Sequence, residues 1–361
     1  MAKPELRIAV VGVGLIGGSV ALAARERLHA RVSGYDASGE ALHAAAARDA
    51  LDEVAGTIDG AVRQADAAFV AVPVGRLPEV VARTLEAAPP NCVVTDVGST
   101  KRAVVAANDD PRFVGGHPLA GAETSGIQHA RPDLFDGATW YLTPRTTSSG
   151  LLYERLHRLL RGLGARPAAI EPDVHDAILA NVSHLPHVLA NVLVEQAGQV
   201  LAEGGERLPA TGPSFRDATR VAGSSSGVWS DIYLSNADAL TEAVDRAITA
   251  LQAVREALAR QDAAWITGWN ERAAAARRRL LEAQLAGERL FELRASVPNR
   301  PGVIAQLALE LGRAGVNIVD MALYPAPDMS DGVVALWIAG DAQADRASSL
   351  VAGLGFPVVR A

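Results

Sequence analysis

The sequence predicts a mixed α/β protein in three parts: a doubly wound sheet over residues 1–170, an all-helical domain over 171–287 and a βαββαβ module over 288–361. Three observations support this fold class. A glycine-rich turn joins the first apolar strand to a helix, and short apolar strands then alternate with helices up to about residue 170. A long alanine- and leucine-rich stretch follows, after which the strand pattern returns.

Composition limits the class of protein. The 361 residues are 49% hydrophobic, which is enough for two or three domains with their own cores. The net charge of -7 at pH 7 is unfavourable for a nucleic-acid or membrane surface, so neither partner is expected. No signal-peptide pattern or apolar run of about eighteen residues is present, and Cys92 is the single cysteine, so we expect a cytoplasmic protein without disulfides.

The N-terminal part begins with a dinucleotide-binding pattern. Residues 7–11 form an apolar strand, and Gly12-Val13-Gly14-Leu15-Ile16-Gly17 follows before a helix. In this Rossmann-type context Gly12 makes the turn, Gly14 admits a pyrophosphate and Gly17 lets helix and strand pack closely. The pyrophosphate would lie at the helix N-terminus, so Leu15 and Ile16 are assigned to the cofactor site as well. A glycine turn without a nucleotide is the alternative.

Asp36 ends the second predicted strand, residues 31–35, about twenty residues after the glycine motif. A carboxylate at this distance is placed to bond the 2'-hydroxyl of a ribose. No basic residue follows at positions 37–39, where one would favour a 2'-phosphate. The pattern therefore favours NAD over NADP as the cofactor.

Further strands are predicted over residues 67–72, 92–96, 112–114, 140–142 and 167–170. Ligands of doubly wound sheets bind outside the carboxyl ends of the strands. The candidate ligand-binding positions each follow one of these ends: Gly12, Asp36, Val72 with Pro73, residues 97–100 and His117. Mainly parallel strands would therefore bring these separate motifs to one edge of the sheet.

His117 lies between two glycine-rich turns in the segment 115–126, directly behind a predicted strand. An imidazole titrates near pH ~6.5 and can accept a hydroxyl proton at neutral pH. His117 is therefore the candidate general base. A buried structural histidine is the alternative reading.

From residue 173 to about 287 the pattern is helical, with no convincing strand. His184 and His187 are three residues apart and share a helix face, and Pro186 between them should start or kink the helix. Such a pair can bind zinc, but no cluster of Cys, His or Glu completes four ligands, so no metal site is predicted. A core or capping role is the other alternative.

The last 70 residues return to strands. A strand over 291–297, a helix ending near 314, strands over 316–319 and 333–338, another helix and a short final strand spell a ferredoxin-like βαββαβ module. The boundary before this module should lie within residues 281–288.

Taken together, the motifs resemble those of the TyrA family, which comprises prephenate dehydrogenases and their arogenate-using relatives, over essentially the whole chain. The resemblance is carried by residues 12–18, 96–101, 116–123, 175–176 with 183–187, and 215–220 with 228–229. The C-terminal module resembles an ACT domain. Positions at which that family binds amino-acid effectors correspond here to Asn299, Arg300, Pro301, Gly302, Asn317 and Ile318.

The resemblance implies a reaction: NAD-dependent oxidative decarboxylation of prephenate to 4-hydroxyphenylpyruvate, with arogenate giving tyrosine directly as the alternative. His117 would take the substrate's hydroxyl proton, while Ser99 orients it or shares that hydroxyl. Arg220 would hold a substrate carboxylate with its planar fork, and His187 would meet the side-chain end of the substrate.

Three further residues take roles from the resemblance. Glu123 and Asp176 would form charged links that gate the pocket, although acidic residues are more often solvated or weakly paired. Trp229 would close the neighbouring subunit's pocket in a homodimer formed by the helical domain. Without the resemblance, Trp229 would be assigned to the core.

Two rival functions differ from this one. A β-hydroxyacid dehydrogenase relies on a lysine in the helical domain, and no lysine follows Lys101. A non-catalytic sensor of NAD and an amino acid would not need His117, His187 and Arg220. Reduction of NAD in the presence of candidate substrates would separate an enzyme from a sensor. Tyrosine is the favoured effector of the C-terminal module.

Overall fold

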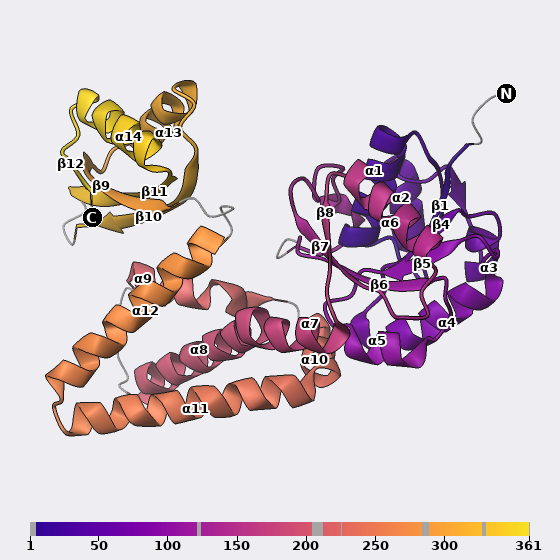
Figure 1. Cartoon of the computed structure of the whole chain (residues 1–361), viewed down its shortest axis with the longest axis horizontal. Coiled ribbons are helices and arrows are strands. Elements are labelled where there is room, and N and C mark those ends of the chain that lie inside the picture. The colour runs from indigo at the N-terminus through magenta and orange to yellow at the C-terminus, as the bar shows by residue number, and fades with distance from the viewer. Residues whose placement is uncertain are drawn as a thin grey trace. The chain divides into compact units, whose positions relative to one another are not determined.

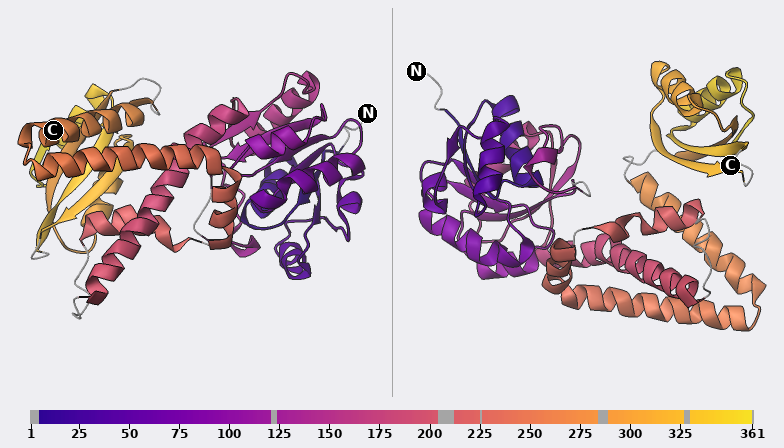
Figure 2. Two further views of the ribbon diagram at one scale, coloured as in Figure 1. Left: turned by 90° about the horizontal axis from the view of Figure 1, so that it is seen from below. Right: turned by 180° about the vertical axis from the view of Figure 1, so that it is seen from behind.

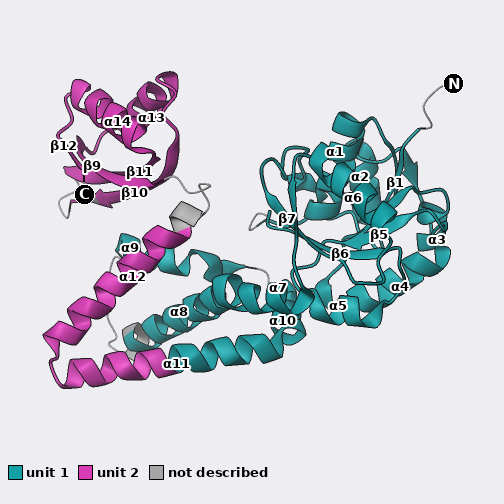
Figure 3. Cartoon of the chain, in the orientation of Figure 1, with its two compact units in different colours: residues 1–248 teal, residues 249–361 magenta. Residues whose placement is uncertain are grey.

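The computed structural model describes residues 5–120, 124–203, 212–224, 226–283, 289–326 and 330–360. The chain divides into two compact units, residues 1–248 and 249–361 (Figure 3). Residues 284–288 of the expected boundary segment lie outside the described part, so the three-domain division with limits near 170 and 287 stays a prediction.

An eight-stranded sheet organises the first unit, in the order β3-β2-β1-β4-β5-β6-β7-β8 (Figure 1). The strands are β1 (Arg7–Val11), β2 (Arg31–Tyr35), β3 (Glu53–Val54), β4 (Ala67–Val70), β5 (Val93–Asp96), β6 (Phe113–Pro118), β7 (Thr139–Thr143) and β8 (Arg166–Ala169). Strands β1 to β6 are parallel, whereas β7 runs antiparallel to β6. The predicted doubly wound, mainly parallel sheet is confirmed. Only the two-residue β3, too short to show a pattern, was not predicted.

Helices cover both faces of this sheet (Figures 1 and 2). They are α1 (Leu15–Leu28), α2 (Gly39–Ala47), α3 (Ile58–Val62), α4 (Leu77–Ala87), α5 (Arg102–Ala107) and α6 (Gly150–Gly162). Alternate residues of β1 point to opposite faces, so Ile8 and Val10 join one core and Ala9 and Val11 the other.

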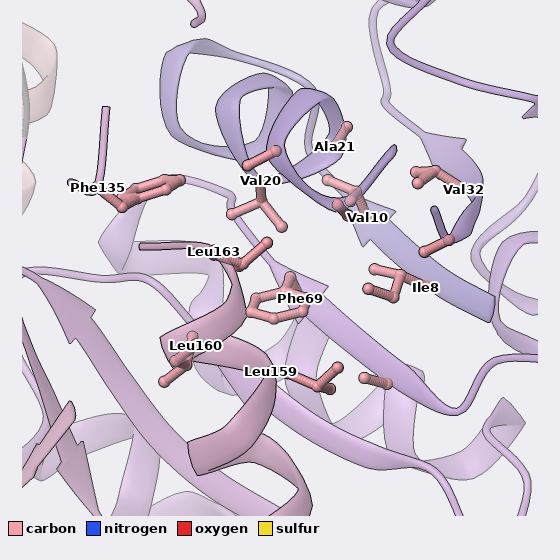
Figure 4. Close-up of a cluster of buried hydrophobic side chains, with 14 of the residues drawn as sticks. Ile8, Val10, Val20, Ala21, Val32, Phe69, Phe135, Leu159, Leu160 and Leu163 are labelled. Carbon is pink, nitrogen blue, oxygen red and sulfur yellow. The ribbon is translucent and has the colours of Figure 1, made fainter. Parts of the chain in front are cut away.

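The first of these cores contains the larger side chains. Phe69 of β4 meets Val20 of α1, Leu160 of α6 and Leu163, which directly follows α6 (Figure 4). All four side chains are fully buried. Complete burial of an aliphatic or aromatic side chain stabilises a fold by roughly 1.5–3 kcal/mol. This core therefore fixes α1, and with it the glycine turn that precedes α1.

Helices follow the sheet along the chain: α7 (Pro172–Leu179), the π turn η3 (Ala180–His184), α8 (Leu185–Glu203), α9 (Pro213–Thr219), the 3-10 turn η4 (Arg220–Gly223), α10 (Ser226–Ser235), α11 (Ala237–Ala259) and α12 (Ala263–Ala283). The described residues between 173 and 283 contain no strand, as predicted. Helix α8 starts one residue before Pro186, which has no N–H to donate to the preceding turn.

The C-terminal module belongs to the second unit. Its elements are β9 (Leu290–Pro298), α13 (Val303–Arg313), β10 (Ile318–Pro325), β11 (Asp331–Ala339), α14 (Asp341–Gly353) and β12 (Val358–Arg360). The sheet is antiparallel with the order β10-β11-β9-β12, and both helices pack on one face around Leu293, Leu307, Leu336 and Val351 (Figure 2). The predicted ferredoxin-like module is confirmed.

Candidate active site

The glycine turn after β1 has the geometry of a nucleotide cradle. Gly12 has φ +95°, and a Cβ there would overlap the carbonyl of Ala71, while a Cβ on Gly17 would overlap the carbonyl of Gly12. Gly14 has no neighbouring heavy atom within 4 Å of an added Cβ, and it caps α1 without a side-chain hydrogen bond. The turn is therefore closed behind and open in front of the α1 N-terminus, as a bound pyrophosphate requires.

Asp36 lies beside this turn at the end of β2. The Val13 N–H donates to Oδ2 and the Ser38 N–H donates to Oδ1, both at 2.8 Å. Val72 packs close to Gly12 from the end of β4, and Pro73 is exposed next to it. Leu15 and Ile16 form the first turn of α1. The residues predicted for the cofactor thus meet at one edge of the sheet, and their arrangement fits a dinucleotide.

His117 lies inside β6, whereas the sequence placed it in the turn after a strand ending at residue 114. Pairing with the antiparallel β7, in which His117 lies opposite Tyr141, extends β6 to Pro118. A Cβ on Gly116 would come within 2.7 Å of Thr95 Oγ1, so a glycine here lets β6 approach the end of β5 closely. The half-buried imidazole is thereby held on a rigid strand.

His117 is the first of three side chains in a hydrogen-bonded row. Its Nδ1 lies 2.9 Å from His175 Nε2, and His175 Nδ1 lies 2.7 Å from Asp176 Oδ1. The backbone N–H groups of Lys101 and Arg102 donate to the two Asp176 oxygens at 2.8 and 2.9 Å. His175 and Asp176 come from α7 and are fully buried.

This row corrects two expectations. Asp176 is not a gate at a pocket mouth, because its carboxylate is buried and saturated by His175 and two backbone N–H groups. Ser99 does not orient His117; it is half-buried after β5, and its hydroxyl makes no hydrogen bond to a described residue, whereas His175 holds the ring. The sequence motif at residues 175–176 was noted, but its contact with a strand 58 residues away is tertiary.

The environment sets the charge of this row. Burial, followed by the charges of His175 and Lys101, lowers the pKa of His117 well below its ordinary value. Burial alone would raise the pKa of Asp176, but the hydrogen bonds from His175 and the backbone of Arg102 and Lys101 lower it overall. At neutral pH His117 is therefore a neutral imidazole that can accept a proton, and Asp176 is an anion.

A buried ion pair supports the strand end beneath His117. Lys101 Nζ pairs with Asp96 Oδ2, and both side chains are fully buried. Asp96 also accepts the Gly116 N–H at 3.0 Å and the Gly98 N–H at 2.8 Å. Burial lowers the pKa of Lys101, and the attraction of Asp96 opposes that shift. Asp96 thus ties the loop that carries Ser99 to the strand that carries His117.

A second cluster surrounds Trp229 of α10. The His187 ring stacks on Trp229 with centroids 3.6 Å apart, its Nδ1 contacts the Tyr233 hydroxyl, and His184 lies edge-on to Trp229 at 6.2 Å. His184 Nε2 and His187 Nε2 are buried and have no hydrogen-bond partner among the described residues. Burial lowers the pKa of His187 and lowers that of His184 to about 4. Buried polar atoms of this kind call for a ligand or water. Tyr233 was not predicted, since nothing in its local sequence marks it.

Of the two remaining candidate residues, Arg220 is described by the structure and Glu123 is not. Arg220 is exposed in η4, and η4 packs against α8, the helix that carries His187. Glu123 lies outside the described residues.

Two family models match the chain. The nucleotide-binding domain of prephenate dehydrogenase matches residues 20–169, and the dimerization domain of prephenate dehydrogenase matches residues 171–269. The chain belongs to the prephenate dehydrogenase family. Within this family, the prephenate dehydrogenase of Bacillus subtilis (strain 168) is 32% identical over 357 residues, 95% of both chains. The cyclohexadienyl dehydrogenase of Zymomonas mobilis is 36% identical over 263 residues, 71% of this chain and 89% of the relative.

Solved structures of a prephenate dehydrogenase and an arogenate dehydrogenase share the fold. The Aquifex aeolicus prephenate dehydrogenase in complex with hydroxyphenyl propionate and NAD+ has a TM-score of 0.71 and 26% identity, and the match covers 78% of this chain and 100% of that one. Synechocystis arogenate dehydrogenase has a TM-score of 0.64 and 26% identity, covering 75% and 99%. The family resemblance drawn from the motifs is confirmed.

The prephenate dehydrogenase family models end at residue 269, before the C-terminal module. In this module Asn299 and Arg300 line a cavity of about 130 Å³ together with Tyr324. Pro301 and Gly302 follow in the same loop, with Gly302 at φ +92° before α13.

Asn317 and Ile318 lie at the other end of this small sheet, which corrects the expectation that Asn317 faces the same ligand. Ile318 of β10 pairs with Ile338 of β11, which in turn pairs with Phe291 of β9. The loop that begins at Asn299 follows Pro298, which is seven residues further along β9. Seven residues of strand span roughly 23 Å. A ligand on the Asn299 loop therefore does not reach Asn317 of the same copy.

Proposed function

We propose that the protein catalyses the NAD-dependent oxidative decarboxylation of prephenate to 4-hydroxyphenylpyruvate. One observation carries the proposal: a neutral, strand-held His117 lies on the carboxyl edge of a sheet whose glycine turn and Asp36 fit a dinucleotide. Similarity to the Bacillus subtilis prephenate dehydrogenase over 95% of the chain supports the choice of substrate.

One group of residues would bind the cofactor, and another would carry out the proton transfer. Gly12, Gly14 and the first turn of α1 would hold the pyrophosphate, and Asp36 the ribose. NAD, when bound, accepts the hydride from the ring carbon that bears the hydroxyl. His117 takes the hydroxyl proton at Nε2 and returns it to the ring oxygen once loss of CO2 has made the ring aromatic. Ser99 shares that hydroxyl.

Substrate binding is assigned to residues of the helical region. Arg220 binds a substrate carboxylate through its planar guanidinium. Because one carboxylate must leave as CO2, Arg220 contributes by positioning the ring. His187 meets the side-chain end. Asn191 Nδ2 lies 3.5 Å from His187 Nδ1 and can only donate, and the Tyr233 hydroxyl contacts the same atom. The ring therefore carries its proton on the buried Nε2 and can donate it to a substrate oxygen.

The alternative substrate is arogenate, which carries an amino group where prephenate carries a keto oxygen. A structural neighbour is an arogenate dehydrogenase. An Nε2–H donor on His187 suits the acceptor oxygens of a keto acid better than an ammonium group, and this favours prephenate.

Steady-state oxidation of both substrates with NAD tests the proposal. We expect NADH to form with prephenate, together with equimolar CO2 and 4-hydroxyphenylpyruvate, at a kcat/KM at least about tenfold above that with arogenate. Preference for arogenate would move the assignment to the alternative. Absence of NAD reduction with either substrate would favour the non-catalytic sensor.

We also infer a cytoplasmic homodimer that forms through the helical region. The continuous helix Pro172–Val200 is long and apolar enough to cross a membrane by length and composition, the one such helix among the described residues. Its exposed side chains include Val182, Leu189, Val192 and Leu193. The match to a dimerization domain over this segment supports a second copy as their cover. Light scattering of the purified protein would give the mass of a dimer.

The loop of Asn299, Arg300, Pro301 and Gly302 is proposed to bind an aromatic amino acid, tyrosine being favoured. Its support is the cavity that Asn299 and Arg300 line and the α13 N-terminus that follows the loop.

A further inference from the structure

The row His117, His175 and Asp176 defines the protonation state of each ring. A carboxylate accepts hydrogen bonds only, and Asp176 already accepts two backbone N–H groups, so it is held as an anion. His175 must therefore donate Nδ1–H to Asp176 across 2.7 Å. A neutral His175 then has its lone pair on Nε2.

The same reasoning extends to the reacting histidine. His175 Nε2 can only accept at 2.9 Å, so His117 donates Nδ1–H to it and keeps its own lone pair on Nε2. Nε2 is the atom that the reaction needs as proton acceptor. The opposite tautomer would place a proton there and leave the base unable to act.

We propose that His175 is a positioning residue of this enzyme, which fixes the tautomer and orientation of His117, with Asp176 fixing His175 in turn. The inference rests on the proposed role of His117 as the base. His175 does not touch substrate, because it is fully buried behind His117.

Packing makes this arrangement rigid. His175 lies edge-on to both His117, at 5.1 Å between centroids, and Tyr141, at 5.6 Å. Rotation of the His175 ring would break both of its hydrogen bonds, and because His175 and Asp176 are fully buried, no water could replace them.

Two substitutions at one position separate a positioning role from simple space filling. In His175→Gln the side-chain oxygen can reach the place of Nε2 and still accept from His117. In His175→Asn the amide reaches only the place of Nδ1, so His117 loses its partner. We expect kcat to fall about 100-fold or more in His175→Asn but only about tenfold or less in His175→Gln, with the KM for prephenate and NAD within about threefold of wild type.

His157→Asn on α6 is the matched control, since it makes the same change at a half-buried histidine whose ring contacts Tyr153. It should keep the wild-type kcat. Equal losses in the Gln and Asn variants, or losses confined to KM, would overturn the positioning role. If wild type itself failed to oxidise prephenate, the proposed function would fail instead.

A measurement on the unaltered protein covers the case in which the variants do not fold. Nitrogen NMR of 15N-histidine-labelled protein at neutral pH should show His117 protonated on Nδ1 and unprotonated on Nε2. In Asp176→Asn the amide can donate to His175 Nδ1, so both rings should switch tautomer and kcat should fall by a factor on the order of 10² to 10⁴. An Nε2–H tautomer of His117 in wild type would overturn the proposal.

Discussion

At the scale of single residues, His117 combines two properties that a base needs. Burial keeps its pKa low, so that it is free of a proton at neutral pH, and the row behind it directs the lone pair to Nε2. A low pKa also weakens a base, but an anionic substrate beside the ring favours the protonated form and raises that pKa. A bound anionic substrate would therefore make His117 a stronger base than it is in the free protein.

Replacing the base tests this directly. His117→Asn should lower kcat by a factor on the order of 10² to 10⁴, the usual contribution of a positioned general base. The Kd for NAD and the KM for substrate should change little, because the cofactor edge and the proposed substrate ligands are untouched. A variant with kcat near wild type would make His117 a structural histidine.

Asp36 is the single residue expected to determine the preference for NAD over NADP. Asp36→Ala should weaken NAD binding, since the carboxylate that would bond the ribose 2'-hydroxyl is lost, while wild type should prefer NAD over NADP at least about tenfold in kcat/KM. Adding a basic residue at Ala37 in the same variant should raise the efficiency with NADP. Comparable efficiency of wild type with both cofactors would contradict the assignment.

At the scale of elements, the continuous helix formed by α7, η3 and α8 carries both halves of the site. Its first turns bring His175 and Asp176 to β6, and its later turns bring His184 and His187 to Trp229 of α10. These histidines are buried, and burial lowers the pKa of His184 to about 4. Burial of these rings therefore couples the folding of this helix to the protonation of its histidines.

This coupling predicts how stability depends on pH. His117, His184 and His187 bind protons less readily in the folded than in the unfolded chain, whose histidines titrate near ~6.5. The unfolded state therefore gains protons first, and the free energy of unfolding should fall as the pH drops from about 6.5 toward 4, and should vary little from this source above 7.

Urea unfolding at pH 7, 6 and 5 measures the effect. His184→Gln, which removes the ionisable group, should show a weaker dependence in this window than wild type. A wild-type midpoint unchanged between pH 7 and 5 would contradict the neutral, buried state of these rings.

At the scale of the whole molecule, the chain joins a catalytic unit to a ferredoxin-like module that offers a separate small cavity. A ligand there changes activity only if it binds two states of the protein with different affinity. The loop of Asn299, Arg300, Pro301 and Gly302 is the feature through which tyrosine would act.

Removing residues 288–361 separates regulation from product competition. If tyrosine acts through the module, the deletion should abolish inhibition that the full chain shows, and Asn299→Ala in the full chain should weaken it several-fold. Inhibition that survives the deletion unchanged would place tyrosine at the active site. If the shortened chain is a monomer where the full chain is a dimer, the role of the module is to stabilise the dimer instead.

The sequence by itself determined the features that depend on neighbours along the chain. Gly12 and Gly17 were assigned from the turn they must form, Asp36 from its distance to that turn, and the βαββαβ order from the alternation of apolar residues. Tertiary structure decided what depends on contacts between distant segments. Pairing with β7 put His117 inside a strand, and packing of α7 on β6 placed His175 behind it and buried Asp176. Antiparallel pairing of β10 with β11 and of β11 with β9 places Asn317 at the end of the sheet opposite the loop of Asn299. Strand, turn and helix signals are local and readable residue by residue, whereas a hydrogen bond across 58 residues leaves no periodic trace in the sequence.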